Sequence, residues 1–365
     1  MKRIVVSVTN DLTTDQRVHK VCTTLFNNGF DILLIGRKLK NSQPIVRDYN
    51  TLRMKLLFNK GALFYAEYNL RLFFILLFSK KDILLSNDLD TLLANYMASK
   101  ISKSILVYDS HELFTEVPEL INRPFAQNIW LKIEKIILPQ LKNCYTVCDS
   151  ISYNYTEKYG CNFKVIRNFP LKLKETKPTS FPFDTKNKKV ILYQGALNKG
   201  RGLELIIETM LFIENSILVI IGSGDIEDFL KQKVSSLHLN NVIKFISKQN
   251  PEELKNFTPL ANLGISIEED LGLNYKYALP NKLFDYINAE IPVLVSNLPE
   301  MEQIIKTYDV GEIVTSRRPK KLAGQIEILL KKEKSYFQKN LEIAKNELIW
   351  ENEEFKLIEI FSPLY

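Results

Sequence analysis

Cysteine is scarce in this 365-residue chain, and its four cysteines show no pairing pattern. Cys22, Cys144, Cys148 and Cys161 form neither a C-x-x-C pair nor a zinc-binding spacing, which excludes a disulfide framework and a zinc domain. We therefore expect them to be small core residues. Glycine and proline are also few, at 13 and 14, which excludes a collagen-like chain.

Long uncharged apolar runs are missing as well. The nearest, residues 72–78, is closed by Arg71 and Lys80 and falls short of the roughly 20 residues that span a bilayer. The apolar residues 4–8 are too few for the core of a signal peptide and predict a strand. We expect a cytoplasmic protein, and a peripheral position at the inner face of the membrane stays open.

The composition is that of an ordinary globular protein, with 45% hydrophobic and 25% charged residues, and the length suggests two domains. Positive charge is concentrated in the first half: residues 1–180 carry a net charge of +10, and residues 181–365 carry −3. A basic half suits a membrane surface, nucleic acid or phosphorylated substrates, or is simply solvated lysine. The basic residues are scattered and no nucleic-acid-binding motif is present, so we expect no nucleic-acid partner.

Short apolar strands alternate with helices in both halves. The expected strands lie at 4–9, 31–36, 82–86, 104–108, 145–148, 164–166, 190–194, 216–221, 242–245, 263–267 and 292–296. Near-continuous apolar strands separated by helices predict parallel sheets covered on both faces. The predicted fold class is α/β, with two Rossmann-like parallel-sheet domains facing across a cleft that would hold the active site.

The alternation also predicts the domain boundaries. The first domain covers 1–170, and 171–189 is a linker because it holds Pro178, Pro182 and six lysines without apolar periodicity. The second domain covers 190–340. The remaining residues, 341–365, predict an amphipathic helix that packs back on the N-terminal domain.

A glycine-rich basic segment follows the strand at 190–194 and leads into a helix. It reads Gly195-Ala-Leu-Asn-Lys199-Gly200-Arg201-Gly202. Glycines allow the backbone to approach a ligand, a helix N-terminus favours an anion, and the two cations add charge. The segment predicts a diphosphate cradle, with a tight turn carrying exposed cations as the alternative. A second turn, Gly222-Ser-Gly224-Asp225, is more typical of an ordinary strand-to-helix connection.

Carboxylates gather after the strand at 263–267. Glu268-Glu269-Asp270-Leu-Gly272 follows that strand, and Pro280-Asn281-Lys282-Leu-Phe-Asp285-Tyr286 opens a helix. A carboxylate accepts two charge-assisted hydrogen bonds at once, which suits the hydroxyls of a sugar or a ribose.

Taken in order, these segments resemble the C-terminal domain of glycosyltransferase family 4, whose members are of the two-domain GT-B type. The N-terminal half is similar to the family in Asp15-Gln-Arg17-Val and in Tyr108-Asp109-Ser110-His111-Glu112. The resemblance covers nearly the whole chain and depends on the order of the motifs. It implies a retaining, metal-independent transferase that moves a sugar from a UDP- or GDP-linked donor to a glycan or lipid-linked acceptor. It also implies a role in bacterial surface polysaccharide or glycolipid synthesis.

The resemblance implies the roles of particular residues. The catalytic residues would be His111, Glu269 and Arg201, with Arg201 on the donor diphosphate and His111 and Glu269 near the transferred sugar. Donor-binding residues would be Gly195, Lys199, Gly222, Gly224, Lys282 and Asp285. Acceptor-side residues in the N-terminal domain would be Asn10, Asp15 and Arg17. No metal and no cofactor are implied.

The chain departs from the family pattern in three places. Ala196 stands where the family often has a second basic residue, and Lys199 is the candidate substitute. Asp285 replaces a glutamate that binds the ribose in the family. It follows Glu269 by sixteen positions instead of eight, as if eight residues were inserted in the stretch from Gly272 to Pro280, and we expect residues 273–278 of this stretch to help form the sugar pocket.

Two other segments have competing interpretations. Asp88 and Asp90 form an Asp-x-Asp pair, which holds a metal in some glycosyltransferases, but we expect them to cap the helix at 91–99. Residues 64–78 are apolar nearly all round a helix, which suits either a buried core helix or a membrane-docking surface.

Two rival functions remain open from the sequence. One is a nucleotide-sugar epimerase or hydrolase on the same fold, which needs a donor site but no acceptor. The other is a non-catalytic module that binds a nucleotide or a sugar.

Overall fold

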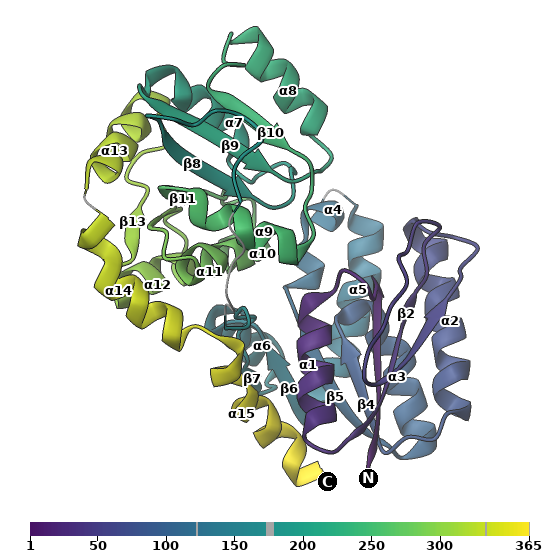
Figure 1. Cartoon of the computed structure of the whole chain (residues 1–365). Coiled ribbons are helices and arrows are strands. Elements are labelled where there is room, and N and C mark those ends of the chain that lie inside the picture. The colour runs from purple at the N-terminus through teal and green to yellow at the C-terminus, as the bar shows by residue number, and fades with distance from the viewer. Residues whose placement is uncertain (122, 173–178, 333, 365) are drawn as a thin grey trace. The chain divides into compact units, whose positions relative to one another are not determined.

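The structure is a computed structural model that describes residues 1–121, 123–172, 179–332 and 334–364. The chain forms two compact units (Figure 1). The first comprises Met1–Asn168 and Glu353–Tyr365, and the second comprises Phe169–Asn352. Each unit is an α/β Rossmann-like domain with one fully parallel sheet. The predicted fold class is thereby confirmed for both halves of the chain.

The first unit has a seven-stranded sheet in the order β3-β2-β1-β4-β5-β6-β7. Its strands are β1 (Arg3–Asp11), β2 (Asp31–Arg37), β3 (Asn50–Met54), β4 (Ile83–Asn87), β5 (Ile105–Ser110), β6 (Asn143–Thr146) and β7 (Phe163–Val165). Its main helices are α1 (Gln16–Asn27), α2 (Gly61–Phe78), α3 (Leu89–Ser102), α5 (Pro124–Ile137) and α6 (Asp149–Tyr159), with a single turn, α4 (Pro118–Ile121).

The second unit has a six-stranded sheet in the order β10-β9-β8-β11-β12-β13. Its strands are β8 (Lys189–Gln194), β9 (Ser216–Ile221), β10 (Ile243–Ile246), β11 (Leu263–Ser266), β12 (Val293–Val295) and β13 (Gly311–Ile313). Its helices are α7 (Leu203–Thr209), α8 (Glu227–Ser236), α9 (Pro251–Phe257), α10 (Leu273–Lys276), α11 (Asn281–Asn288), α12 (Pro299–Tyr308), α13 (Pro319–Lys331) and α14 (Lys334–Glu347). The last helix, α15 (Trp350–Phe361), contains the boundary between the two units.

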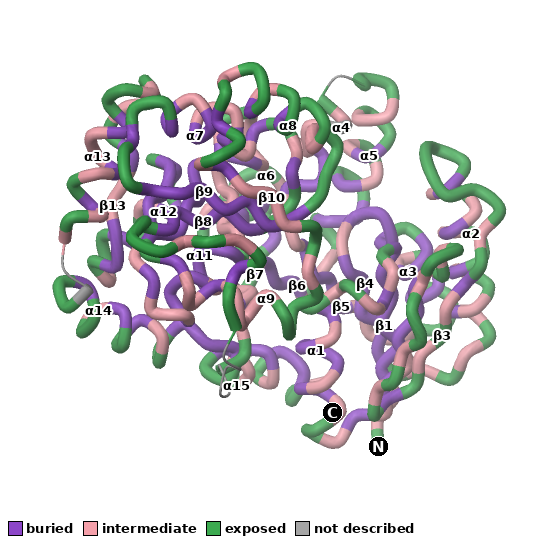
Figure 2. Tube along the Cα trace, turned by 45° about the horizontal axis from the view of Figure 1, so that its top comes forward, coloured by how far each residue is buried: buried purple, intermediate pink, exposed green. Residues whose placement is uncertain are grey.

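The strands inside each sheet are largely buried (Figure 2). Every residue of β4 and β9 is buried, as expected for strands covered by helices on both faces. Cys22, Cys144, Cys148 and Cys161 all lie in the described part of the chain; they form no disulfide and are buried, which confirms their prediction as core residues.

Close packing fixes helix α11 against the second sheet. A Cβ on Gly264 of β11 would lie 2.4 Å from the ring of Tyr286, so only glycine admits that ring. The Tyr286 hydroxyl in turn donates to Leu192 O and accepts from the Gln194 amide. Residues on α11 are therefore held in a fixed register over the ends of β8 and β11.

Some boundaries differ from the predictions. Strands β3 and β13 were not predicted, because both are short edge strands without an apolar run. Part of the predicted linker, residues 173–178, lies outside the described residues. The C-terminal segment rejoins the first unit at Glu353 rather than at 341, because Leu341 and Ala344 are buried in the core of the second unit.

Candidate functional site

The order of the strands locates a candidate ligand site in each unit, at the edge of the sheet where the strands have their carboxyl ends. In the first unit the chain reverses its direction of winding between β1 and β4, and in the second between β8 and β11. Open parallel sheets bind ligands beyond the carboxyl ends of the strands at such switch points. Asn10 and Asp88 lie at this edge of the first unit, and Gly195 and Glu268 at that of the second.

The glycine-rich segment folds as the turn between β8 and α7. Gly200 and Gly202 have positive φ angles, and a Cβ on Gly202 would lie 2.2 Å from Ile267 O. Glycine is therefore required where this turn crosses the end of β11. Gly195 is exposed, and a Cβ placed on it would lie 3.9 Å from the ammonium of Lys282. The backbone beside that ammonium is open to a ligand.

A buried ion cluster lies beneath this turn. The Glu268 carboxylate has no exposed surface, and its Oε1 lies 2.7 Å from Lys282 Nζ and 4.0 Å from Arg201 Nη1. Ser266 Oγ donates to its other oxygen at 2.9 Å. Burial by itself would raise the pKa of Glu268, but Lys282 and then Arg201 hold this pKa below its usual value. One carboxylate between two cations leaves a net positive charge, which suits an anionic ligand.

Lys282 can bind a ligand in addition to its carboxylate partner. It projects from the first turn of α11, is 8% exposed, and lies over the face of the Tyr193 ring at 4.1 Å. An ammonium group has three protons, and one ion pair with Glu268 uses one of them. The sequence singled out Lys282 and Arg201, and the structure brings them together around Glu268.

The inserted segment supports the cationic turn. Tyr275 lies on α10, its hydroxyl donates to Lys199 O at 3.1 Å, and its ring lies 5.2 Å from the Arg201 guanidinium. Just before this segment, the Leu271 side chain would lie 2.5 Å from a Cβ on Gly200. The insertion therefore holds the backbone at Lys199 and the side chain of Arg201. The Lys199 side chain is exposed.

Glu269 has a different environment from its neighbour. Its carboxylate is about a third exposed, and Oε1 lies 3.9 Å from Nη2 of Arg317, while its amide donates to Gly200 O. Arg317 also donates to Ile267 O and Glu268 O, so it secures the chain where it leaves β11. The family resemblance assigned the carboxylate role to Glu269. In the structure, however, the carboxylate that contacts Lys282 and Arg201 is that of Glu268.

Sequence reasoning passed over Glu268, although a signal for it exists. The buried side chains of Ser266 and Glu268 are two positions apart in extended chain, which places them on the same face. A carboxylate on the buried face of a strand end needs a cation partner. Lys282, at the start of the next long helix, is that partner.

Asp285 lies three residues after Lys282, on the same face of α11. Its Oδ2 accepts from Gln194 Nε2 at 3.0 Å, and Gln194 Oε1 accepts from Thr258 Oγ1. This chain orients Asp285 at the end of β8.

Gly222 and Gly224 serve the packing of two turns. A Cβ on Gly222 would lie 1.9 Å from Gly195 O, and one on Gly224 would lie 2.5 Å from Leu197 O. The Leu197 amide donates to Ser223 O across this contact. These two glycines shape the turn that contains Gly195 by letting a second backbone approach it.

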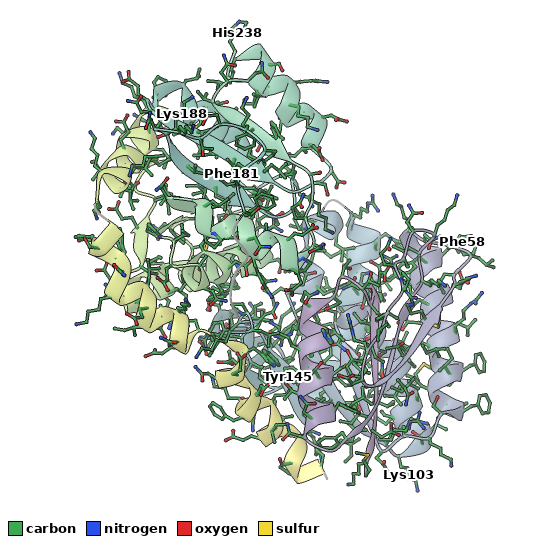
Figure 3. All side chains as sticks on the ribbon, in the orientation of Figure 1. Phe58, Lys103, Tyr145, Phe181, Lys188 and His238 are labelled. Atoms are coloured by element: carbon green, nitrogen blue, oxygen red, sulfur yellow. The ribbon has the colours of Figure 1, made fainter. Side chains whose placement is uncertain are left out.

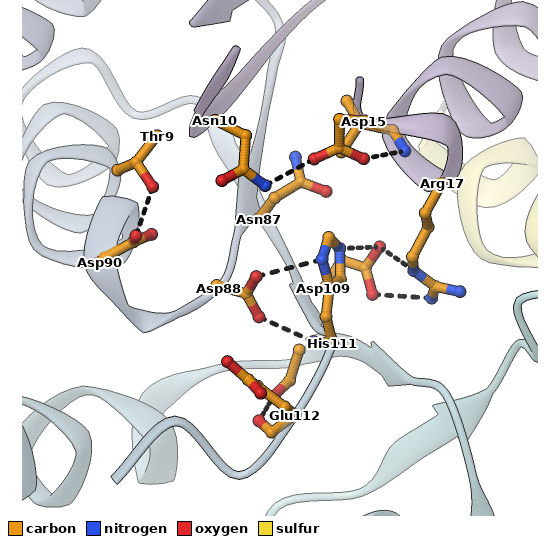
Figure 4. A network of polar contacts seen from close by, with 12 residues as sticks. Thr9, Asn10, Asp15, Arg17, Asn87, Asp88, Asp90, Asp109, His111 and Glu112 are labelled. Atoms are coloured by element: carbon orange, nitrogen blue, oxygen red, sulfur yellow. Dashed lines mark hydrogen bonds and ion pairs between the residues drawn. The ribbon is translucent and has the colours of Figure 1, made fainter. Parts of the chain in front are cut away.

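The first unit holds a separate polar network around His111 (Figure 4). Its Nδ1 lies 3.1 Å from Asp88 Oδ2 and its Nε2 lies 3.1 Å from Asp109 Oδ2. Burial would lower the pKa of the imidazole, but the two carboxylates hold it well above its usual value. An acceptor at each ring nitrogen favours the imidazolium form, in which both ring nitrogens donate.

Arg17 belongs to this network and not to an open surface. Its guanidinium is buried and donates to both oxygens of Asp109, at 2.8 and 3.0 Å, and to Ile166 O. Burial alone would raise the pKa of Asp109, but Arg17 and His111 lower it to about 2. The acceptor-side role of Arg17 stays a prediction, and the structure shows its donors bonded inside the fold. Arg17 positions Asp109, which positions His111.

Asn10 and Asp15 remain at the edge where they were predicted. Asp15 caps α1 by accepting from the Val18 amide, and Asn10 donates to its other oxygen at 2.9 Å. Asn10 is exposed.

The capping role predicted for Asp88 and Asp90 is wrong. Asp88 occupies the N-cap of α3 with a positive φ of 57°, but its side chain accepts from the His111 amide and ring. Asp90 is buried and accepts from Thr9, and burial, with the nearby Asp88, raises its pKa to about 8. Among the described residues, no group of three or more His, Cys, Asp or Glu side chains could hold a metal ion.

Comparison with known proteins finds similarity to glycosyltransferases. Residues 176–346 match the family model described as glycosyl transferases group 1. Over 149 residues, or 40% of the chain, the sequence is 29% identical to an uncharacterized glycosyltransferase of Methanocaldococcus jannaschii. That match covers 36% of the relative, so the chain matches little more than a third of the relative's length.

Solved structures share the fold of the whole chain. Sucrose-phosphate synthase of Thermosynechococcus elongatus has a TM-score of 0.83 at 14% identity, covering 100% of this chain and 99% of that one. The Anabaena protein HepE, in complex with UDP and glucose, has a TM-score of 0.74 at 15% identity and full coverage of both. The structural matches place both units in the GT-B fold, and the matches together support a glycosyltransferase.

Proposed function

We propose that the protein is a glycosyltransferase that takes a sugar from a nucleoside-diphosphate donor bound to the second unit. The observation that supports this most is the Glu268 cluster: Lys282 and Arg201 flank one buried carboxylate beside the open backbone of Gly195. The donor diphosphate would lie against these two cations, as the resemblance implies for Arg201. HepE, which shares the fold, was solved with UDP and glucose.

The proposed reaction retains the anomeric configuration and needs no metal. Departure of the diphosphate is assisted by fixed cations, since Lys282 and Arg201 are held in place before the ligand arrives. The leaving phosphate would accept the proton of the acceptor hydroxyl on the same face of the sugar. Glu269 would lie beside the sugar, and Asp285, oriented by Gln194, would bind the ribose.

His111 is proposed to face the transferred sugar as a cationic donor. Two carboxylates hold it in that state, so it cannot act as a general base without losing one of them. Asn10 and Asp15 would contact the acceptor, which we propose is a glycan or lipid-linked glycan of a bacterial surface polysaccharide or glycolipid. Lys199 is the proposed second cation of the donor turn.

A transfer assay tests this proposal. The purified protein is incubated with UDP- and GDP-sugars in EDTA, with and without a mixture of lipid-linked and free glycan acceptors. Release of the nucleoside diphosphate that depends on acceptor, with product of unchanged anomeric configuration by NMR, supports the proposal. Equal release without acceptor favours the hydrolase, and binding without turnover favours the non-catalytic module.

A further inference from the structure

Helix α2 is apolar on two opposite faces, and only one of them is buried. Phe64, Tyr68, Leu72 and Leu76 are buried against the sheet, and the Tyr68 hydroxyl donates to Val8 O at 2.6 Å. On the other face, large apolar side chains are exposed to solvent: Leu63 by 59%, Leu70 by 61%, Phe74 by 49% and Phe78 by 82%. The sequence left a buried helix and a membrane-docking helix open, and the structure has features of both.

The exposed apolar surface extends beyond α2. The turn before it carries Leu57 and Phe58, whose amides are held by the Glu67 carboxylate of α2. Figure 3 shows Phe58 near one end of α2. Helix α3 packs along α2 and exposes Leu93, Met97 and Ile101, which share one face at intervals of four residues. We call this surface the α2–α3 face; its members are Leu57, Phe58, Leu63, Leu70, Phe74, Phe78, Leu93, Met97 and Ile101.

Charge on these two helices has one sign at the surface. Both acidic residues are withdrawn from solvent: Asp90 is 6% exposed, and Glu67, with a side chain 12% exposed, pairs with Arg71 at 2.7 Å. The cations Arg71 and Lys100 are exposed. Exposed lysines also flank the helices, namely Lys60, Lys80 and Lys103. An apolar face with a basic rim is the pattern of a protein surface that enters the headgroup region of anionic lipid.

We propose that the α2–α3 face docks the protein on one leaflet of an anionic lipid bilayer. A second copy of the chain is a poorer occupant. An isologous dimer places the same patch on both partners, so the exposed lysines Lys60 and Lys80 would add like charge to both sides of the interface. Phosphate headgroups instead neutralise this rim while Phe74 and Phe78 enter the acyl boundary.

Helix α2 lies on the membrane rather than across it. Its 18 residues have a mean hydropathy of 1.3, and among the described residues it is the helix long and apolar enough to span a bilayer by length and composition. The helix connects β3 to β4, and both strands belong to the same parallel sheet. A spanning α2 would place those strands on opposite sides of the bilayer. The expectation that no segment has spanning composition is thereby corrected, and the topology limits the contact to one leaflet.

Vesicle sedimentation tests the docking surface without any sugar or nucleotide, so its outcome is independent of the proposed transfer reaction. The full chain is spun with vesicles of phosphatidylcholine alone and of phosphatidylcholine mixed with phosphatidylglycerol. The expected result is binding to the mixed vesicles that weakens as salt rises. Phe74→Gln with Phe78→Gln is expected to lower vesicle partitioning about tenfold or more, because two large apolar groups no longer enter the lipid.

A matched control tests whether vesicle binding depends on the α2–α3 face or on any exposed apolar side chain. Phe229 on α8 is 52% exposed, and Phe229→Gln is expected to leave vesicle binding unchanged. Lys80→Glu with Lys100→Glu is expected to abolish the preference for anionic vesicles, and it keeps the test valid if the double phenylalanine variant does not fold. The oligomeric state of the wild type and of every variant is measured by light scattering.

Three results would overturn the proposal. The wild-type chain could fail to sediment with anionic vesicles. The phenylalanine and lysine variants could bind them like the wild type. Alternatively, the wild type could be a dimer that Phe74→Gln with Phe78→Gln converts to a monomer, which would assign the face to a second copy.

Discussion

Removing Lys282 tests whether its ion pair with Glu268 is part of the fold as well as of the donor site. In Lys282→Met, the fully buried Glu268 carboxylate keeps Ser266 at 2.9 Å and Arg201 at 4.0 Å but loses its partner at 2.7 Å. Breaking a buried pair by removing one partner costs about 3–5 kcal/mol. Because Arg201 remains, we expect the lower end of that range, about 3 kcal/mol. For a unit of this size such a loss lowers the melting temperature by roughly 6–12 °C.

The matched control is Lys345→Met in the same unit. Lys345 Nζ lies 2.8 Å from Glu290 Oε1, but both side chains are about a third exposed. Exposed pairs contribute about 0–1 kcal/mol, so its melting temperature should change little. Adding Glu268→Gln to Lys282→Met removes the orphaned charge, and we expect most of the lost stability to return. Binding of a nucleoside diphosphate should not return, because the ammonium is still absent.

The pH dependence has a definite sign. In the wild type the pKa of Glu268 is depressed, so the pair stabilises the fold above the unfolded pKa of glutamate and ceases to do so as pH falls. In Lys282→Met, burial dominates and raises the pKa of Glu268. The difference in melting temperature between variant and wild type should therefore shrink as the pH is lowered. A Lys282→Met protein as stable as Lys345→Met at pH 7 would refute the reasoning.

Three further predictions concern the donor site, His111 and the buried Asp90. Arg201→Ala should weaken nucleoside-diphosphate binding at least tenfold, and Glu269→Ala should lower turnover more than nucleotide affinity. Imidazole NMR should show His111 protonated at pH 7, and Asp88→Asn should lower its pKa because one of its two carboxylate partners is lost. The folded pKa of Asp90, about 8, exceeds its unfolded value, so Asp90 should make stability fall between about pH 4 and 8 by up to about 1.4 kcal/mol per unit. In Asp90→Asn that slope should disappear.

Each of these predictions has a contradicting outcome. Wild-type donor affinity and turnover in both the Arg201 and Glu269 variants would show that the donor site is misplaced. A His111 resonance that titrates near its ordinary pKa would contradict the two-carboxylate clamp; the chain has only three histidines, so each can be assigned by substitution. The free energy of unfolding can be measured by urea denaturation at several pH values. If it depends on pH in Asp90→Asn as it does in the wild type, Asp90 is ionised in the folded state.

The alternation of strands and helices predicted the two sheets because their central strands are nearly continuous apolar runs. β9 is buried at every position and was predicted at its observed bounds. β3 was not predicted, because Asn50–Met54 is an edge strand whose alternate residues reach solvent, so polar side chains are tolerated there.

The site was only partly predictable, because a sequence motif identifies a functional residue but not the residues that it contacts in the fold. Lys282 and Arg201 were selected, but Glu268, which lies between them, was passed over in favour of the more exposed Glu269. Arg17 was read as an acceptor residue because it follows the first strand. Its pairing with Asp109, 92 positions later, depends on the sheet bringing α1 beside β5. Such long-range pairs follow from topology, which local spacing does not specify.

Calorimetric titration of the full chain with UDP, GDP, ADP and CMP, each with EDTA, tests the central claim most directly. The account predicts that one nucleoside diphosphate binds without metal, and that Arg201→Ala and Lys282→Met both abolish the signal while Lys345→Met keeps it. Binding of none of the four nucleotides, or binding that both Arg201→Ala and Lys282→Met leave intact, would contradict a donor site at the Glu268 cluster.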